Sequence, residues 1–401
     1  TAWGSILIEA LNNYDFNEAS LTATMNTSKQ TNATANSSVG GLVGATGGYA
    51  SVTVTANTDA TVKTGASVTS TGGDINVTAD SRNNAKSMAN GKAYGAIGIG
   101  KSTAYATLNS GTRATAVDGL SSDRTELHAG GNVLLHSYAD TVVDVDAIGG
   151  GSGLLSVNEA DAVASVSGDV ITSSIGAYNT VTAGDLVELT AVRSADVRSD
   201  AVLDGVFNVL DFNDPDASAT ITNALATVSI GSNTTVDANR VVMTADDSYV
   251  YASAYAKSST DVTFAADFRP DSTVNINVSS NVFIGAGAQI TATDSVSILA
   301  RENDVRTSSY AYGHVAAGIT SNLIVTANNT RTSAANVTTA ATASITTKTL
   351  TVETVGSQSA GGDKTYTNAE TDAQTISRFV QTGVETVCTI VGEVVCLWGL
   401  V

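Results

Sequence analysis

The chain is poor in the residues that fill ordinary globular cores. Its 401 residues include only 2 Pro, 2 Cys, 2 Trp and 7 Phe, and 14% of them are charged. Ordinary domains fill their cores with aromatic residues and Leu, so two or three such domains are not expected. A disordered chain needs low hydrophobicity and high charge, whereas this one is 42% hydrophobic. We therefore expect a folded chain with a thin core of Val, Ile, Ala and Thr.

Further absences exclude partners and targeting segments. The formal net charge of −19 and the pI near 4.3 argue against nucleic acid, whose phosphates require basic contacts. No stretch reaches the ~20 apolar residues of a membrane helix, so no membrane span is expected. The chain opens at Thr1 without Met or a signal peptide, which suggests a mature product or an internal segment.

What the sequence does contain is a regular internal repeat. A short strand with β-formers in alternate positions recurs six times at intervals of about 54 residues, and stepping back once more reaches a weak copy at Leu21 and Ala23. The recurring pairs are Ile75/Val77, Val133/Leu135, Val187/Leu189, Val241/Met243, Val296/Ile298 and Leu350/Val352. Both prolines, Pro215 and Pro270, occupy one repeat position. Such self-similarity indicates a stack of equivalent units.

Apolar residues alternate at period two within each repeat, as in Val274/Ile276, which is typical of half-buried strands. One coil cannot stand alone, so coils must stack about 4.8 Å apart. We predict an all-β protein, a parallel β-solenoid (β-helix) over residues 20–355, with a lead-in or cap over 1–19 and a polar linker and apolar C-terminal cap or docking segment over 356–401. A string of β-sandwiches would need ~100 residues per unit. Whether one repeat forms three coils of ~18 residues or one wide flattened coil is open at this stage.

The repeat resembles a known class of proteins. The strand Asp74–Ala79, the Gly65-Ala66-Ser67-Val68 approach to it and the Ala/Ser-rich tail after it are similar to the repeats of large bacterial filamentous adhesins of the haemagglutinin-like and leukotoxin-like type. The resemblance covers residues 20–355. It implies an extracellular or bacterial cell-surface location and a shaft that holds binding regions away from the cell.

One acidic cluster is a candidate cation site. Asp211, Asn213, Asp214 and Asp216 offer oxygen ligands at spacings that could hold Ca²⁺, but a downstream bidentate Glu and a central Gly are missing. The competing interpretation is an ordinary Pro-containing turn. No other cofactor is expected, because His128, His136 and His314 lie too far apart for ligand pairs, and the motifs of nucleophilic elbows and phosphate loops are absent.

Tyrosines form the second candidate site. Tyr249, Tyr251 and Tyr255 alternate, and Tyr310 and Tyr312 follow one repeat later. Exposed stacked rings could bind glycans of a host or biofilm surface, or a neighbouring filament. The competing interpretation is that the rings shield a sheet face or fill a wide part of the interior.

The C-terminal segment ends in the most apolar run of the chain. The stretch from Cys388 to Cys396 is symmetric about Gly392, so a hairpin would place the two Cys opposite each other for a disulfide. A helix from Ile376 through Val391 is the alternative, with the two Cys unbridged. This end could cap its own chain or dock onto the next one, and head-to-tail or lateral contacts between copies would build a filament.

The expected function is therefore that of an extracellular structural or adhesive shaft, with self-assembly into a filament as one form of it, and not that of an enzyme. The alternatives are a polysaccharide-acting β-helix lyase or glycosidase, which needs converging carboxylates, and a passenger-type toxin segment.

Overall fold

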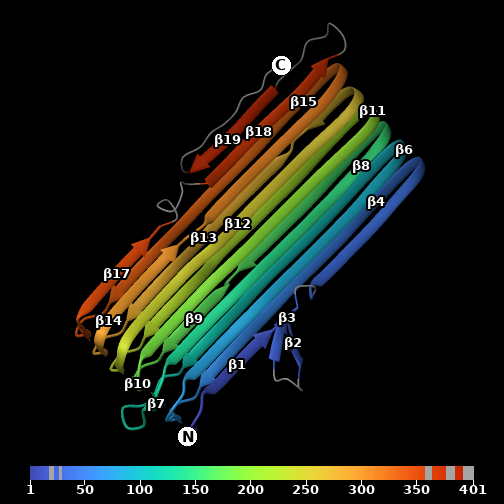
Figure 1. Cartoon of the computed structure of the whole chain (residues 1–401). Coiled ribbons are helices and arrows are strands. Elements are labelled where there is room, and N and C mark those ends of the chain that lie inside the picture. Colours follow the sequence, from blue (N-terminus) through green and yellow to red (C-terminus); the bar gives the residue numbers. More distant parts are fainter. Residues whose placement is uncertain (18–21, 27–28, 357–363, 376–383, 392–401) are drawn as a thin grey trace.

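The computed structural model describes residues 1–401 except 18–21, 27–28, 357–363, 376–383 and 392–401. Strands make up almost all of the described chain, and they stack as seven coils of one parallel sheet (Figure 1). The strands are β1 (Ile6–Asn12), β2 (Tyr14–Asn17), β3 (Thr22–Met25), β4 (Thr31–Val62), β5 (Ser67–Ser70), β6 (Ile75–Ala116), β7 (Thr125–Ala129), β8 (Val133–Ser167), β9 (Val170–Ile175), β10 (Asn179–Ala183), β11 (Leu186–Ile230), β12 (Thr235–Phe268), β13 (Asp271–Ile284), β14 (Gln289–Glu302), β15 (Val305–Thr339), β16 (Ser344–Thr346), β17 (Thr349–Val355), β18 (Lys364–Thr375) and β19 (Val384–Val391).

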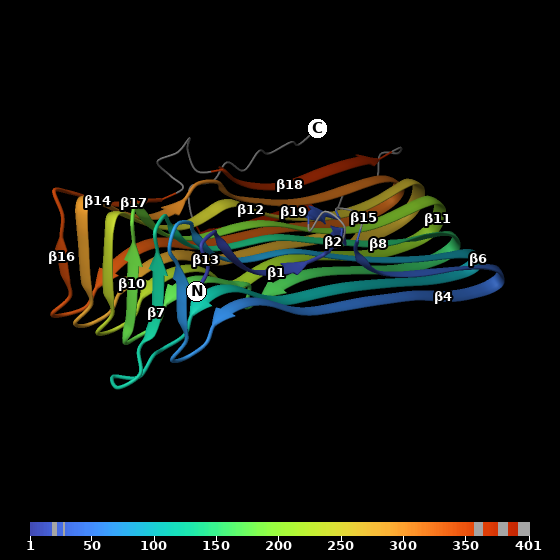
Figure 2. The same ribbon diagram turned by 60° about the horizontal axis from the view of Figure 1, so that its bottom comes forward.

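Each repeat forms one wide flattened coil. An outbound strand runs along one face, turns at a tip and returns along the other face, and a short closing strand joins the two at the end opposite the tip (Figures 1 and 2). Ile75 pairs with Val133, and Val133 pairs with Val187. Paired residues are thus one sequence repeat apart, so each repeat forms one coil and not three. Seven coils give a stack about 34 Å high, and an outbound run of about 18 residues spans about 59 Å.

The predicted ladder is confirmed at every clear copy. Val187 pairs with Val241, Val241 with Val296, and Val296 with Leu350. The members from the second to the sixth coil are buried, whereas Leu350 and Val352 of the last coil are half exposed. Stacking in register lets each aliphatic row cover the next, because parallel neighbours project equivalent side chains to the same side.

The first coil begins earlier than the sequence suggested. Ile6 pairs with Ile75 and Ile8 with Val77, so the first copy of the ladder lies at Ile6/Ile8; of the predicted pair, Leu21 lies outside the described residues and Ala23 pairs with Phe16 in an antiparallel hairpin. The antiparallel hairpin β2–β3 interrupts this coil before β4. The hairpin makes the first repeat longer than 54 residues. Stepping back by one regular repeat from the second copy therefore reached residue 20 and not Ile6. At the other end β18 and β19 pair parallel with β15, so the sheet also continues past residue 355.

The core changes in residue size along the coil. Near the closing strands three sides enclose the interior, and it holds Ile, Leu and Met, such as Leu127, Ile175 and Met243. Where only two faces oppose each other, Ala and Val dominate, as at Ala89 and Ala164. Small side chains let two sheets approach closely, so the composition follows the local thickness of the coil.

Glycines make the sharp tips possible. Gly95 has a φ of +155°, and a Cβ added to it would lie 2.0 Å from the carbonyl oxygen of Gly41 in the preceding coil. The run Gly149–Gly153 forms the tip of the third coil, and a Cβ at Gly153 would lie 1.9 Å from the oxygen of Gly95. The backbones of successive tips therefore approach closely, and a side chain at Gly95 or Gly153 would overlap the preceding coil.

A charged cluster lies inside the coil between the two aliphatic regions. The side chain of Arg193 is fully buried, and its Nη2 lies 2.6 Å from Oδ1 of the equally buried Asp247. Its Nη1 donates to the carbonyl oxygen of Asp169 at 3.3 Å. Burial raises the pKa of the carboxyls of Asp169, Asp247 and Glu302. Arg193 is thus the fully buried cation of a cluster with three buried carboxyl groups.

Candidate functional site

The tyrosines lie on the outward side of the outbound face. They alternate with the buried Val250, Ala252 and Ala254, so the expectation that the rings fill the interior is wrong. Tyr255 pairs with Tyr310 in the sheet, as their separation of one repeat in the sequence indicated. The paired rings stack with centroids 5.3 Å apart and planes at 16°.

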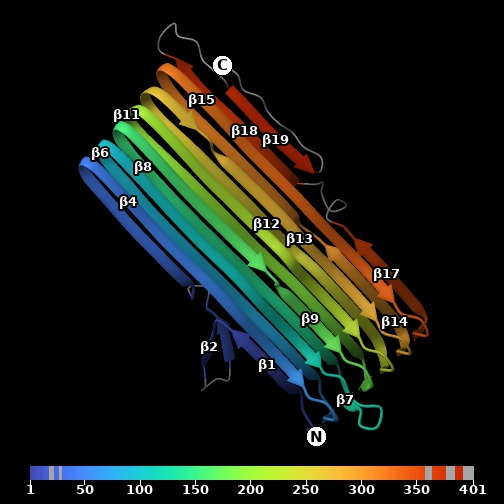
Figure 3. The same cartoon turned by 180° about the vertical axis from the view of Figure 1, so that it is seen from behind.

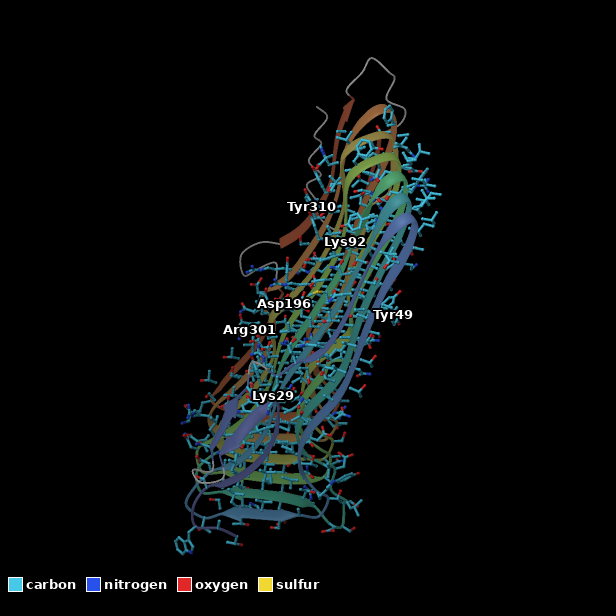
Figure 4. All side chains as sticks on the ribbon, turned by 90° about the vertical axis from the view of Figure 1, so that its right-hand side faces the viewer. Lys29, Tyr49, Lys92, Asp196, Arg301 and Tyr310 are labelled. Atoms are coloured by element: carbon cyan, nitrogen blue, oxygen red, sulfur yellow. The ribbon has the colours of Figure 1, made fainter. Side chains whose placement is uncertain are left out.

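A third ring extends this stack. Tyr312 lies two residues after Tyr310, with ring centroids 6.4 Å apart and planes at 15°. We call Tyr255, Tyr310 and Tyr312 the tyrosine stack; Tyr310 is labelled in Figure 4. All three rings are partly exposed. They form a stacked aromatic row across two coils, because in-register stacking sets like side chains side by side.

The other two tyrosines are covered by cations. The guanidinium of Arg198 lies 5.8 Å from the ring centroid of Tyr251, and that of Arg306 lies 5.9 Å from that of Tyr249. These distances are within the range of cation–π contacts. The predicted five-residue site therefore separates into a stacked group of three and a pair that arginines cover.

Carboxylates continue the row of the tyrosine stack into the preceding coils. Asp146 pairs with Asp200, and Asp200 pairs with Tyr255. Burial, followed by the neighbouring charges of Asp146 and Asp144, raises the pKa of Asp200 to about 6. Burial, followed by the charge of Asp200, raises the pKa of Tyr255. This face thus presents hydrogen-bonding acids beside an aromatic surface.

The predicted Ca²⁺ ligands do not converge. Asp211 and Asn213 face the interior, where Asp211 accepts a hydrogen bond from Thr260 and Asn213 accepts one from Nδ2 of Asn158 at 2.9 Å. Asp214 and Asp216 face outward. The segment is not a turn either, since it lies within β11 and strand alternation sends successive side chains to opposite sides. Within the described ranges, no group of three or more His, Cys, Asp or Glu side chains could hold a metal ion.

Asp216, one of the outward members of this segment, belongs to a row that the sequence reasoning missed. Asp161, Asp216 and Asp271 pair with one another on successive coils, and we call them the acidic ladder. These three aspartates recur at one position of the repeat, and this recurrence could have predicted the row from the sequence. Burial, followed by the charges of Asp214 and Asp271, raises the pKa of Asp216 to about 7. Burial also raises the pKa of Asp161 and of Asp271.

A shallow cavity of about 330 Å³ adjoins the acidic ladder. Glu159, Asp214, Phe212 and Arg269 are among the residues that line it. Nζ of Lys101, next to Glu159, lies 3.7 Å from Asp161. The return face therefore combines neighbouring carboxyls of raised pKa, two cations and an exposed aromatic ring.

The C-terminal predictions fall mostly outside the described residues. Val384–Val391 is strand β19, parallel to β15, so the helix is wrong over this part. The turn at Gly392 and Cys396 lie outside the described residues, and so does the disulfide between Cys388 and Cys396.

Comparisons with protein-family models, with curated proteins and with solved structures gave no match. The fold itself defines the class as a parallel β-solenoid with wide two-faced coils. Among the residues that the structure describes, no helix is long and apolar enough to span a membrane.

Proposed function

We propose that the chain is a structural and adhesive segment of an extracellular protein, in which the solenoid presents the tyrosine stack to a glycan. The observation that carries this proposal is the near-parallel stacking of three outward rings on two adjacent coils. Sugar rings present C–H faces to aromatic faces, and carboxylates accept hydrogen bonds from hydroxyl groups. Asp146 and Asp200 lie in the same row as Tyr255, so carboxyl groups and aromatic rings follow one another along one line.

The repetitive architecture supports the structural part of the role. The coils repeat the same row-on-row contacts, and the parallel ladder continues from coil to coil through backbone hydrogen bonds. A stack of this kind resists bending and sets a binding surface on a rigid support. The resemblance to filamentous adhesin repeats suggests the same use.

Calorimetric titration with cellohexaose, chitohexaose and alginate oligosaccharides tests the adhesive role. Tyr310→Ala should weaken binding about tenfold, equal to about 1.4 kcal/mol, because it interrupts the stack at its centre. Tyr310→Phe should retain binding within about threefold, since the ring face remains. Tyr105→Ala, on the return face beside Tyr49, is the matched control and should bind as the parent does. Unchanged binding in Tyr310→Ala would reject the tyrosine stack as the site.

The acidic ladder favours a second candidate function, glycoside hydrolysis on the return face. Coil stacking sets neighbouring carboxyls about 4.8 Å apart and alternate ones about 9.6 Å apart, near the separations that retaining and inverting glycosidases use. A carboxyl with a pKa of about 7, such as that of Asp216, is a suitable general acid at neutral pH. A reducing-sugar assay on polysaccharides separates the two functions. Cleavage that Asp216→Asn abolishes would establish the enzyme, and absence of cleavage across neutral and acidic polysaccharides would leave binding alone.

A further inference from the structure

Exposed apolar side chains gather at the tips of the coils. The most exposed include Leu42 at 81%, Val206 at 64%, Leu154 at 60%, Phe207 at 49% and Phe264 at 48%. They belong to the first, third, fourth and fifth coils, whose tips lie side by side (Figures 1 and 3). We call this surface the tip ridge; Figure 4 shows side chains projecting from the stacked tips.

The tip ridge is continuous from coil to coil. Ile97 pairs with Leu155, which pairs with Leu210, and Phe207 pairs with Val262. Register pairing places these side chains next to one another across coils. The ridge is thus a property of the stack and not a scatter of single exposed residues.

The area of the ridge matches a protein interface. Ten large apolar side chains lie within a few residues of the tips and are 36% to 81% exposed: Leu42, Val43, Tyr94, Ile97, Leu154, Val206, Phe207, Leu210, Val262 and Phe264. At roughly 200 Å² per side chain they expose more than about 1,000 Å². A typical monomer exposes no apolar patch beyond about 600 Å², and a stable interface uses about 800 Å² per partner.

Charges along the ridge differ between its two ends. Lys92 lies just before the tip of the second coil, whereas Asp204 and Asp261 lie at the tips of the fourth and fifth coils. Asp261 is exposed. Asp204 binds Lys257 at 3.1 Å, so Asp261 supplies the net negative charge. Reversing the coil order of a second copy would bring its fifth coil opposite the second coil of the first, with Asp261 opposite Lys92.

We propose that two copies of the chain associate through their tip ridges in an antiparallel, two-fold symmetric dimer. A two-fold axis perpendicular to the stack, between the third and fourth coils, makes the interface self-complementary and closed. It buries Leu154 against Val206 and Phe207 of the other copy, and it pairs each Lys92 with an Asp261. A parallel arrangement would place like charges together, which disfavours it.

The second copy is favoured over a lipid surface by the acidity of the chain. Anionic membranes attract basic segments, but the net charge here is −19, and the ridge carries Asp204 and Asp261 beside its apolar side chains. The ridge also follows a flat edge about 20 Å long over five coils, which suits an equally flat partner.

Sedimentation velocity on the full chain tests the proposal, from about 1 to 100 µM. The parent chain should be a dimer. The double variant Phe207→Asp and Phe264→Asp should be a monomer at all these concentrations, because two buried charges would face the partner. Phe283→Asp is the matched control, since Phe283 is 41% exposed but lies near the opposite end of the coil. Far-UV circular dichroism must show the same fold in all variants.

Charge reversal tests the antiparallel order. Lys92→Glu and Asp261→Lys should each weaken the dimer about tenfold, and the two together should restore it. Failure of the double reversal to restore the dimer would overturn this arrangement. A monomeric parent chain, open-ended oligomers, or equal disruption by Phe283→Asp would overturn the dimer itself. Ridge-dependent flotation with vesicles of phosphatidylcholine and phosphatidylglycerol, without dimerisation, would identify lipid as the occupant instead.

Discussion

Replacement of Arg193 by Ala should strongly destabilise the fold at neutral pH. Arg193 is fully buried and contacts Asp247 at 2.6 Å, in a cluster that also contains Asp169 and Glu302. Removing one partner of a buried ion pair leaves an uncompensated charge and costs about 3–5 kcal/mol. Urea unfolding followed by circular dichroism, with the midpoint converted to a free energy of unfolding, measures this cost.

The neighbouring surface arginine gives the matched control. Arg198 lies on the same strand and binds Asp196 at 2.7 Å, but its side chain is 55% exposed. Arg198→Ala should cost no more than about 1 kcal/mol, because solvent screens an exposed pair. The Arg193→Ala defect should also shrink at pH 5, since burial raises the pKa of the freed carboxyls and they can take up protons. Equal effects of the two replacements, or a defect independent of pH, would refute the buried-cluster reasoning.

Three further predictions concern the tips, the acidic ladder and the core. Gly95→Ala should lower stability by about 2 kcal/mol or more through backbone overlap with Gly41, whereas Gly40→Ala, with nothing within 4 Å, should change it by less than about 0.5 kcal/mol in the same urea assay. Because the pKa of Asp216 in the folded state is raised to about 7, its contribution to the free energy of unfolding should fall as the pH rises from the ordinary aspartate range through 7. Asp216→Asn should remove this pH dependence and should stabilise the fold at pH 8 by about 1 kcal/mol after solvent screening. Leu127→Ala should lower the thermal midpoint, costing about 3 kcal/mol, because Leu127 is fully buried where three sides meet; an unchanged midpoint would contradict that packing.

The candidate sites were only partly predictable from sequence. The repeat length was enough to place Tyr255 and Tyr310 at equivalent positions, and the structure adds that both rings face outward. Period-two alternation could have divided the predicted Ca²⁺ ligands into the inward Asp211 and the outward Asp216. A turn around Pro215 was expected instead, because proline usually interrupts strands, yet here it lies within a strand with its side chain buried.

The buried cluster had a sequence signal that was missed: Arg193 continues the alternate, inward register of Leu189 and Ala191. Arg193 and Asp247 lie one repeat apart along the chain and pair only because the register is parallel. Its burial was not predicted because a charged residue in a strand ordinarily faces solvent, and the sequence does not show which carboxyl groups would surround the guanidinium.

The amino-acid sequence by itself determined the repeat length, the strand character of each repeat and the rows of residues that stack, because those depend on local periodicity and on equal spacing along the chain. Only the tertiary structure decided how the repeat closes: whether it makes one coil or three, where the tips lie, and which face each side chain meets. Coil width depends on contacts between residues far apart in the sequence, and sequence periodicity alone does not encode which of those faces oppose each other. The tyrosine stack, the acidic ladder and the tip ridge all follow from that closure.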